Sequence, residues 1–387
     1  MAAGPSRSIP VLTHTQAREL AGKCWRIDGT YYRFKPLDPR QPGQPSWRSG
    51  AEGKAFPLLD PQGRIAAYLK FFSIPSQKRL LRTQWLIAQQ MDCWLASLAA
   101  APRRWADTQE LGRPPDTPFD FAGCLAQAVP GFTWLELKYR IAQETTPMLD
   151  SLRWRCACDL IRATALLESA GIVHGDLSPN NIIVDPGAPP DQPALYLIDF
   201  DAFVAQACRG ADAVSAEEGG TYGTEGYCPP DLVKKAGAGV NSVAPYSDRF
   251  ARDMLLLELL LMGPGCPADE PPAKWNQSKL RRQIQACMNR STLSSQVLAY
   301  LQEIPGVFSW PEHARAKSCQ IAGQLGLSLP PAPTLRQAPR LAQVRPARPA
   351  PPPQAAPAPP RPRRASRPVR VAYAVLGFIV IALSALM

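Results

Sequence analysis

Two short stretches near the middle of the chain constrain it most, namely IVHGDLSPNNIIV at Ile172–Val184 and LIDFDAF at Leu197–Phe203. In the first, a polar loop with Asp176 and Asn181 lies between two apolar runs that read as strands. In the second, Asp199 ends a further apolar strand. The sequence therefore presents three oxygen-bearing side chains in a fixed order beside apolar strands.

These side chains suit phosphoryl transfer. The reaction needs an acceptor-only group that takes or orients the hydroxyl proton, and oxygen ligands for the Mg²⁺ ions that bridge the phosphates. Asp176 fits the first role, and Asn181 and Asp199 fit the second. The stretch resembles the catalytic loop and the metal-binding segment of protein kinases, here HGDLSPNN and DFD, which implies ATP and Mg²⁺ as cofactors.

The resemblance continues downstream. GTEGYCPPD at Gly223–Asp231 is similar to the end of a kinase activation segment, and SDRFA at Ser247–Ala251 opens an apolar helix as the buried helix of that family does. It implies that Asp248 hydrogen-bonds the backbone of the catalytic loop and that His174 anchors the loop. Thr224 matches a threonine typical of Ser/Thr kinases, with a structural role in the substrate site.

Upstream, SGAEGKAF at Ser49–Phe56 resembles the glycine-rich loop that covers the ATP phosphates. Lys70, in AAYLK, stands in the place of the lysine that holds the α- and β-phosphates. The stretch AQAVPGFTWLELK resembles the hinge that meets adenine through its backbone. The resemblance therefore implies an ATP site that includes Lys70, Gly50, Gly53, Gln127 and Val129.

Four departures from the kinase pattern bear on activity. Gly175 replaces the arginine before the catalytic aspartate, and Ser178 replaces a lysine that neutralises the γ-phosphate. Asp201 replaces the glycine of DFG, either as another metal ligand or as a polar turn residue. The helix expected over Ser76–Ala100 contains no Glu to pair with Lys70, and its polar inward candidates are Gln84, Gln89, Gln90 and Asp92.

Three functions therefore remain open. The preferred one is a Ser/Thr protein kinase similar to the bacterial kinases of eukaryotic type, because GTEGYCPPD and SDRFA serve the docking of peptide substrates. Small-molecule kinases of the aminoglycoside and choline type share the HGDLxxxN loop but generally lack those two features. The third function is a nucleotide-binding pseudokinase scaffold that transfers no phosphate.

We expect an α+β chain with a two-lobed, protein-kinase-like fold and one C-terminal transmembrane helix. Strand patterns, including Ala122–Gln127, come first, and helical patterns such as Met148–Ala170 follow. The expected parts are an N-terminal extension at 1–46, a kinase-like domain at 47–328 (N-lobe about 47–127, C-lobe about 131–328), a linker rich in Pro, Ala and Arg at 329–368, and a transmembrane helix at 371–387.

The last segment, Val371–Met387, has 17 residues without a charge. As a helix it would be roughly 25 Å long, at the short end of a membrane span. Five arginines between Arg361 and Arg370 crowd one flank, which places that flank in the cytoplasm by the positive-inside rule. We therefore expect a single-pass, tail-anchored protein of the inner (plasma) membrane with its kinase domain in the cytoplasm.

The positive charge of the chain is concentrated before this segment. The net charge is +11, but nine arginines and no acid lie between Arg336 and Arg370, so the remainder is nearly neutral. This distribution argues against a nucleic-acid partner. The 14 prolines of Leu329–Pro368 favour an extended polyproline II spacer, and its PPP and PAPP runs also offer a site to a polyproline-binding partner.

Overall fold

The computed structural model describes most of the chain between Val11 and Leu335. The described residues are 11–27, 29–40, 44–49, 53–72, 77–95, 98–107, 114, 116–143, 148–205, 223–229, 247–262, 268–274, 277–290 and 315–335. Gly50, Asp231, most of the expected linker and the expected transmembrane segment lie outside them. The described residues belong to one compact unit, Met1–Leu341.

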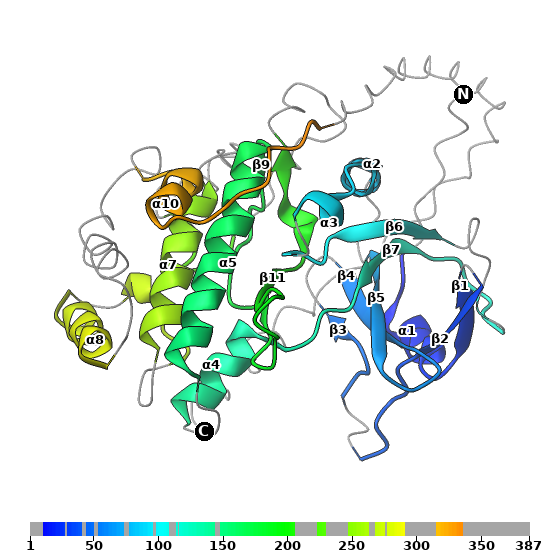
Figure 1. The fold of residues 1–387 in the computed structure, drawn as a ribbon. Coiled ribbons are helices and arrows are strands. Elements are labelled where there is room, and N and C mark those ends of the chain that lie inside the picture. The colour runs from blue at the N-terminus through cyan, green and yellow to red at the C-terminus, as the bar shows by residue number, and fades with distance from the viewer. Residues whose placement is uncertain are drawn as a thin grey trace, which may run out of the picture. The chain divides into compact units, whose positions relative to one another are not determined.

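The N-terminal region, up to Gln127, is built on an antiparallel sheet, coloured blue to cyan in Figure 1. The strand order is β1-β2-β4-β5-β7-β6, and β3 pairs with β4. Because β5 lies between β4 and β7, Lys70 stands inside the sheet opposite Cys124. The strands are β1 (Cys24–Ile27), β2 (Thr30–Phe34), β3 (Arg48–Ser49), β4 (Gly53–Leu59), β5 (Ile65–Phe72), β6 (Pro102–Asp107) and β7 (Ala122–Gln127).

One aromatic core stabilises this sheet. Phe34, Phe56, Phe71 and Phe121 are buried, and the ring centroids of contacting pairs lie 5.0 to 6.5 Å apart. Edge-to-face and stacked pairs at these distances add to the stabilisation from burial alone. The core fixes the strands from which Lys70 projects.

Residues 11–34, which the sequence analysis assigns to an extension, take part in the same sheet. The helix α1 (His14–Leu20) begins at a capping box formed by Thr13 and Gln16 and buries Leu20 in the aromatic core. β1 and β2 form one end of the sheet and add the buried ring of Trp25. This segment is therefore structurally part of the N-terminal region.

The single helix expected over Ser76–Ala100 is divided in the structure. It forms α2 (Gln77–Ala88) and α3 (Met91–Trp94). Gln90 separates them because it has a φ of 50°, in the left-handed region that a right-handed helix excludes. Beyond α3, the backbone of Leu98 and Ala100 hydrogen-bonds with Leu197 of the C-terminal region. Tertiary backbone contacts thus replace the last turns of the expected helix.

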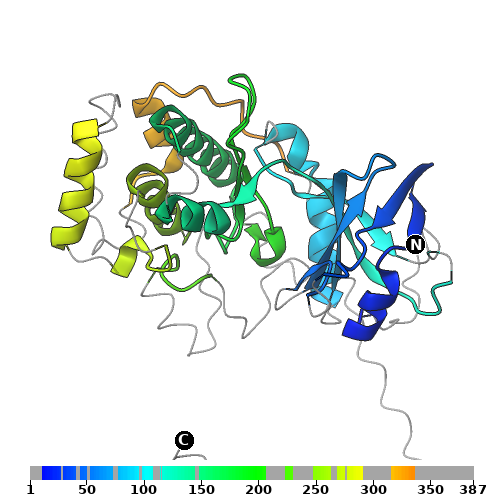
Figure 2. The ribbon, with the colours of Figure 1, turned by 90° about the horizontal axis from the view of Figure 1, so that it is seen from below.

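The described residues from Phe132 onward form the C-terminal region, which is mainly helical and is coloured green to orange in Figures 1 and 2. Its short strands pair in the orders β11-β10-β8 and β12-β9. An antiparallel sheet followed by a helical region makes the chain α+β, which is consistent with a kinase-like fold. The elements are β8 (Phe132–Thr133), α4 (Trp134–Ala142), α5 (Asp150–Ser169), β9 (Ile172–Val173), β10 (Ile182–Val184), β11 (Leu195–Leu197), η1 (Phe200–Ala202), β12 (Val204–Ala205), α7 (Ser247–Leu261), η3 (Pro272–Lys274), α8 (Gln277–Arg290) and α10 (Ser318–Gln324).

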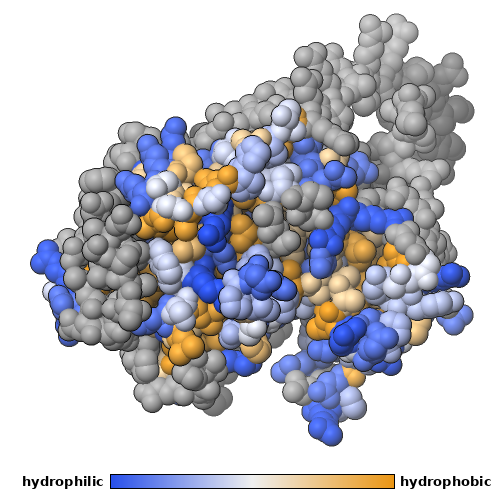
Figure 3. Space-filling view, viewed as in Figure 1, coloured by the Kyte–Doolittle hydropathy of each residue, from blue (hydrophilic) through white to orange (hydrophobic). Residues whose placement is uncertain are grey.

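The helices α5 and α7 lie side by side in this region (Figures 1 and 2). α7 is buried from Arg249 to its end because its sequence MLLLELLL is apolar on nearly every side. The side chains of Trp85 and Leu86 from α2 and Met91 from α3 pack into the same core. On the face shown in Figure 3, hydrophilic side chains lie between the hydrophobic ones, as expected when the apolar residues serve internal cores.

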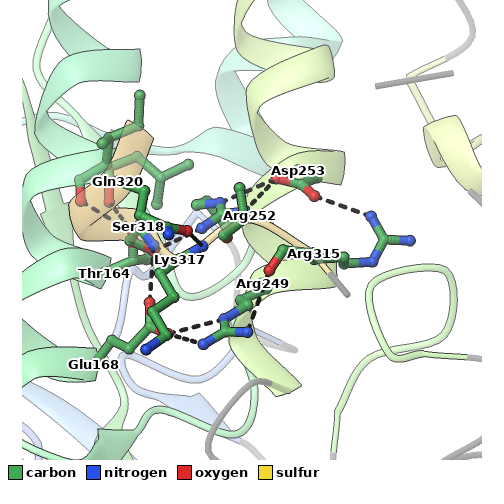
Figure 4. Close-up of polar contacts among 12 residues, drawn as sticks. Thr164, Glu168, Arg249, Arg252, Asp253, Arg315, Lys317, Ser318 and Gln320 are labelled. Carbon is green, nitrogen blue, oxygen red and sulfur yellow. Dashed lines mark hydrogen bonds and ion pairs between the residues drawn. The ribbon is translucent and has the colours of Figure 1, made fainter. Parts of the chain in front are cut away.

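A polar cluster fixes the first turns of α7 to α5 and to the start of α10 (Figure 4). Glu168 of α5 accepts from Arg249 Nε at 2.9 Å and from the backbone N of Ser318 at 2.8 Å. Asp253 of α7 accepts from Arg315 Nη1 at 2.9 Å. Pairing with an opposite charge offsets the cost of removing a buried charged group from water. The cluster therefore holds the N-terminal end of α7 in place.

The described chain ends beside the same core. Leu329 and Leu335, which the sequence analysis assigns to the linker, are half-buried against it. Among the described residues, no helix combines the length and the apolar character needed to cross a bilayer. The expected transmembrane segment, 371–387, is not among those residues.

Candidate functional site

Buried strand pairs position the polar loop at 174–181. β9 precedes the loop and pairs with β12, and β10 follows it and pairs with β11 and β8. Every residue of β9, β10 and β11 is buried. The apolar runs on either side are thus fixed in the core, and the loop carries the polar side chains between them.

Both carboxylate oxygens of Asp176 are hydrogen-bonded. Asn181 Nδ2 donates to Oδ2 at 2.8 Å and to the main-chain oxygen of Asp176 at 2.8 Å, and Thr224 Oγ1 donates to Oδ1 at 2.9 Å. Burial raises the pKa of Asp176 above its ordinary value, and the charge of Asp199 adds to this effect, while the bonds from Thr224 and Asn181 oppose it. The carboxylate is therefore held in one orientation, and its burial makes it more basic than an exposed aspartate.

Lys70 joins the group from β5. Its Nζ lies 2.5 Å from Asp199 Oδ1 and 2.8 Å from Asp201 Oδ2. Burial alone would lower the pKa of Lys70, but the charges of Asp201 and Asp199 raise it above the ordinary value, so the side chain is an ammonium. Asp199 has a φ of 61°, which turns the chain from β11 into η1. The turn places two carboxylates beside one lysine.

The loop is also held through its backbone. Asp248 Oδ2 accepts from the backbone N of His174 at 2.6 Å, and Oδ1 accepts from that of Gly175 at 3.0 Å. His174 is fully buried, with Nε2 2.9 Å from the carbonyl oxygen of Ile198 and its ring centroid 4.7 Å from that of Phe200. These contacts connect the loop to the start of α7 and to the turn that carries Asp199.

The segment 223–229 is anchored by a buried network. Tyr227 OH donates to Glu258 Oε1 of α7 at 2.5 Å, and Lys138 Nζ of α4 donates to the same oxygen at 3.0 Å. Trp134 Nε1 donates to Glu258 Oε2 at 2.9 Å. Sequence reasoning missed this network, although a Glu within the apolar run MLLLELLL signals a buried acid that needs partners.

The expected ATP-binding residues outside the loop are spread along the sheet. Gly53 begins β4, and a Cβ there would lie 2.5 Å from the carbonyl oxygen of Phe71 and 3.3 Å from Lys70 Cε. Gln127 ends β7 as an exposed residue, and Val129 follows half-buried. Within the described part of the chain, the hydrogen-bond partners of Asp176 are His174, Asn181 and Thr224. Gln127 and Val129 are not among them.

Two further residues of the site come from outside the expected set. Asp201, which the sequence left between two roles, pairs with Lys70. Arg82 of α2 donates through Nη2 to the carbonyl oxygens of Asp201, at 3.0 Å, and of Phe203. The available signal for Arg82 was its position on the same helical face as Trp85 and Gln89, at i, i+3 and i+7.

The oxygen atoms of Asn181 and Asp199 fit a magnesium ion. The Asn181 amide uses its nitrogen to bind Asp176, which orients the group and leaves Oδ1 for a cation. The Asp199 carboxylate is 40% exposed. Amide and carboxylate oxygens suit Mg²⁺, which takes its remaining ligands from phosphates and water. Within the described ranges, no group of three or more His, Cys, Asp and Glu side chains is placed to hold a metal ion.

Comparison with known proteins gives a distant relative. No model of a known protein family matches the chain. The chain is similar to the "Probable inactive leucine-rich repeat receptor kinase XIAO" of Oryza sativa subsp. japonica, with 33% identity over 138 residues. The match covers 34% of this chain and 11% of that protein, so the chain spans about a tenth of the relative's length. Together with the antiparallel sheet and the helical region, this similarity supports a kinase-like relationship.

Proposed function

We propose that the chain transfers the γ-phosphoryl group of ATP to serine and threonine hydroxyls of proteins. The observation that carries this proposal is the arrangement of Asp176, whose carboxylate oxygens accept from Asn181 and Thr224 beside the ion pair of Lys70 and Asp199. An oriented carboxylate, a lysine and oxygen ligands for a metal are the groups that phosphoryl transfer uses. The distant similarity to a protein named as a probable inactive receptor kinase supports the kinase-like fold of this site but not its activity.

Each residue has a separate task in this reaction. Asp176 accepts the proton of the hydroxyl while the hydroxyl oxygen forms its bond to the γ-phosphorus, and the bond from that phosphorus to the leaving oxygen of ADP breaks. Lys70 binds the α- and β-phosphates, and Asn181 and Asp199 hold Mg²⁺. The bound ion supplies positive charge that offsets the charge on the phosphates.

The segment 223–229 favours a protein as the acceptor. Thr224 bonds directly to Asp176, and Tyr227 ties the same segment to Glu258. A segment fixed beside the acceptor site provides a surface on which a peptide can dock. A small metabolite does not require such a surface, so this observation favours a protein kinase over a small-molecule kinase.

A nucleotide-binding scaffold without transfer activity is the second candidate. Ser178 stands where the resembled kinases carry a lysine, and its hydroxyl is buried with no hydrogen-bond partner among the described residues. The site therefore lacks one positive charge near the γ-phosphate, which lowers the electrostatic stabilisation of the transition state. The similar protein is also named as probably inactive.

Labelled ATP separates these functions. The purified full-length chain is incubated with Mg²⁺, γ-labelled ATP and a mixture of proteins and metabolites, and the labelled sites are mapped. Label in protein serine or threonine that disappears in Asp176→Asn supports the proposal. Label in metabolites alone indicates a small-molecule kinase, and nucleotide binding without any labelled product indicates a scaffold.

A further inference from the structure

Among the described residues, Lys70 pairs with two carboxylates, and both belong to the turn that follows β11. Its Nζ lies 2.5 Å from Asp199 Oδ1 and 2.8 Å from Asp201 Oδ2. The Asp201 side chain is 13% exposed, against 40% for Asp199, so Asp201 is the more enclosed partner. Water and salt screen an enclosed ion pair less than an exposed one. Asp201 is therefore better placed to fix the lysine.

The carboxylate of Asp199 has two cations to bind in the proposed function, namely Lys70 and Mg²⁺. In the proposed function it is a ligand of Mg²⁺, and a bound cation is the largest local charge in such a site. The metal therefore competes with Lys70 for the Asp199 carboxylate. Asp201 also pairs with Lys70, and the proposed function gives its carboxylate no other task.

The helix α2 supplies no carboxylate to Lys70. Its sequence, QKRLLRTQWLIA at Gln77–Ala88, contains neither Asp nor Glu. Gln84 is exposed, and Gln89, just after the helix, donates through Nε2 to the carbonyl oxygen of Trp85 at 3.0 Å. In the resembled kinases a glutamate of the corresponding helix holds the lysine. No described side chain of α2 can take that role, because none carries a carboxylate.

Arg82 of α2 instead holds the turn. Its Nη2 donates to the carbonyl oxygen of Asp201 at 3.0 Å and to that of Phe203. Its guanidinium carbon lies 5.0 Å from the ring centroid of Phe203, and the ring of Trp85 stacks on the same phenylalanine at 5.8 Å. The helix therefore binds the backbone of the segment that begins at Asp201 and packs against the side chain of Phe203.

We infer that Asp201 is a positioning residue for Lys70, and that Arg82 positions Asp201 by holding the 201–203 backbone. This inference rests on the proposed function, in which Lys70 binds the phosphates of ATP. The charges are reversed relative to the resembled kinases, because here the helix supplies the cation and the turn supplies the carboxylate. A displacement of α2 would therefore move the 201–203 backbone through Arg82, and with it the Asp201 carboxylate that positions Lys70.

ATP binding to the full-length chain without Mg²⁺ tests the role of Asp201. Asp201→Asn keeps the size of the side chain and removes its charge, and we expect ATP affinity to fall by about tenfold or more. Asp201→Glu restores the charge and recovers part of the affinity. The matched control Asp191→Asn changes an exposed acid between β10 and β11 and leaves the affinity unchanged. A metal ligand has no effect in Mg²⁺-free solution, so a loss there assigns Asp201 to Lys70.

The same measurement tests Arg82. We expect Arg82→Gln to weaken Mg²⁺-free ATP binding, and the double variant with Asp201→Asn to lose no more than the stronger single variant, because both act on one contact. Thermal unfolding of each variant shows whether it is folded. Losses that add fully in the double variant contradict the link between Arg82 and Asp201.

Wild-type Mg²⁺-free affinity in a folded Asp201→Asn chain overturns the inference. Should that variant not fold, Arg82→Gln decides in its place, and unchanged affinity in a folded Arg82→Gln chain overturns it equally. A wild-type chain that binds ATP but transfers no phosphate overturns only the proposed function, and the binding comparison still decides the inference. A wild-type chain that binds no ATP overturns both.

Discussion

Gly175 lies so close to the carbonyl oxygen of Ala202 that a Cβ atom at Gly175 would be 2.5 Å from that oxygen. Gly175 also has a φ of +82°, a conformation that glycine adopts without steric cost. The close approach brings the loop with Asp176 against the turn with Asp199. It gives a physical reason for glycine where the resembled kinases have arginine, because a side chain on this backbone would push the two segments apart.

We therefore expect Gly175→Ala to destabilise the chain more than the matched variant Gly63→Ala. Gly63 has a φ of +81°, but a Cβ atom there would meet nothing within 4 Å, so Gly63→Ala carries the conformational cost without the close contact. The conformational cost is roughly 1–2 kcal/mol in both variants. The contact adds about 1–3 kcal/mol at Gly175 alone. Thermal unfolding followed by tryptophan fluorescence measures both, and equal shifts in Tm would contradict the role of the contact.

Asp176→Asn tests the proton acceptor of the proposed reaction. The amide keeps the shape of the side chain but cannot take the hydroxyl proton, so we expect phosphate transfer to fall by about 10²-fold or more while ATP affinity changes little. Asp199→Ala, by contrast, removes a proposed ligand of Mg²⁺ and is expected to abolish Mg²⁺-dependent nucleotide binding. Parallel assays of transfer and binding separate the two variants. Wild-type transfer by Asp176→Asn would show that another group accepts the proton.

Asp248 gives the stability of the chain a pH dependence whose sign follows from its surroundings. Burial raises the pKa of Asp248 above its ordinary value of 3.8, although the charge of His174 and the backbone bonds from Gly175 and His174 act against this. A carboxyl whose pKa is higher in the folded state binds its proton more readily there. Its contribution to the free energy of unfolding is therefore most favourable below about pH 4 and is lost as the pH rises through the folded-state pKa.

Asp248→Asn cannot titrate, so the Tm of the wild type minus that of the variant should be largest at low pH and decrease as the pH rises. The asparagine also has one acceptor oxygen for the two N–H groups of the loop, which costs about 1–3 kcal/mol throughout. Thermal unfolding between about pH 4 and pH 8 measures both effects. A Tm difference that grows with pH would contradict the raised pKa, and Asp191→Asn serves as the exposed control.

The sequence predicted the helices and strands whose apolar periodicity lies within a single segment of the chain. The strand expected over Ala122–Gln127 is β7 with the same bounds, and the helix expected over Met148–Ala170 is α5 at Asp150–Ser169. Asp176 and Asn181 are also close in sequence, and their hydrogen bond lies within one loop. Periodicity and motif spacing carry this information because the interactions span few residues.

The contacts that the sequence did not indicate join distant segments. Arg82 binds the backbone of Asp201, which is 119 residues away, and no local pattern selects that partner. Residues 11–34 likewise join the sheet because Trp25 and Phe34 complete a core whose other rings lie far along the chain. The end of the expected helix has the same origin, since Leu98 and Ala100 bond with the backbone of Leu197 and not within a helix.

The segment Val371–Met387, which lies beyond the described residues, remains a proposal as a membrane anchor. Its 17 uncharged residues are expected to hold the full-length chain in the membrane fraction during a carbonate wash. Deleting the segment should release the chain into the soluble fraction with its phosphate transfer unchanged, because we expect the proline-rich stretch to act as a spacer between the segment and the site. Recovery of the full-length chain in the carbonate supernatant would contradict the anchor.

The arginines before this segment separate a spanning helix from a surface attachment. Each of the five between Arg361 and Arg370 contributes roughly 1 kcal/mol of attraction to anionic lipid when it lies within a Debye length of the surface. Replacing all five by Gln should therefore disturb the orientation of the chain, measured by protease protection in sealed vesicles, and leave it resistant to carbonate. A peripheral protein held by these charges would instead leave the membrane in high salt. Release of the five-Gln variant by carbonate would assign membrane binding to the arginines and not to the apolar segment.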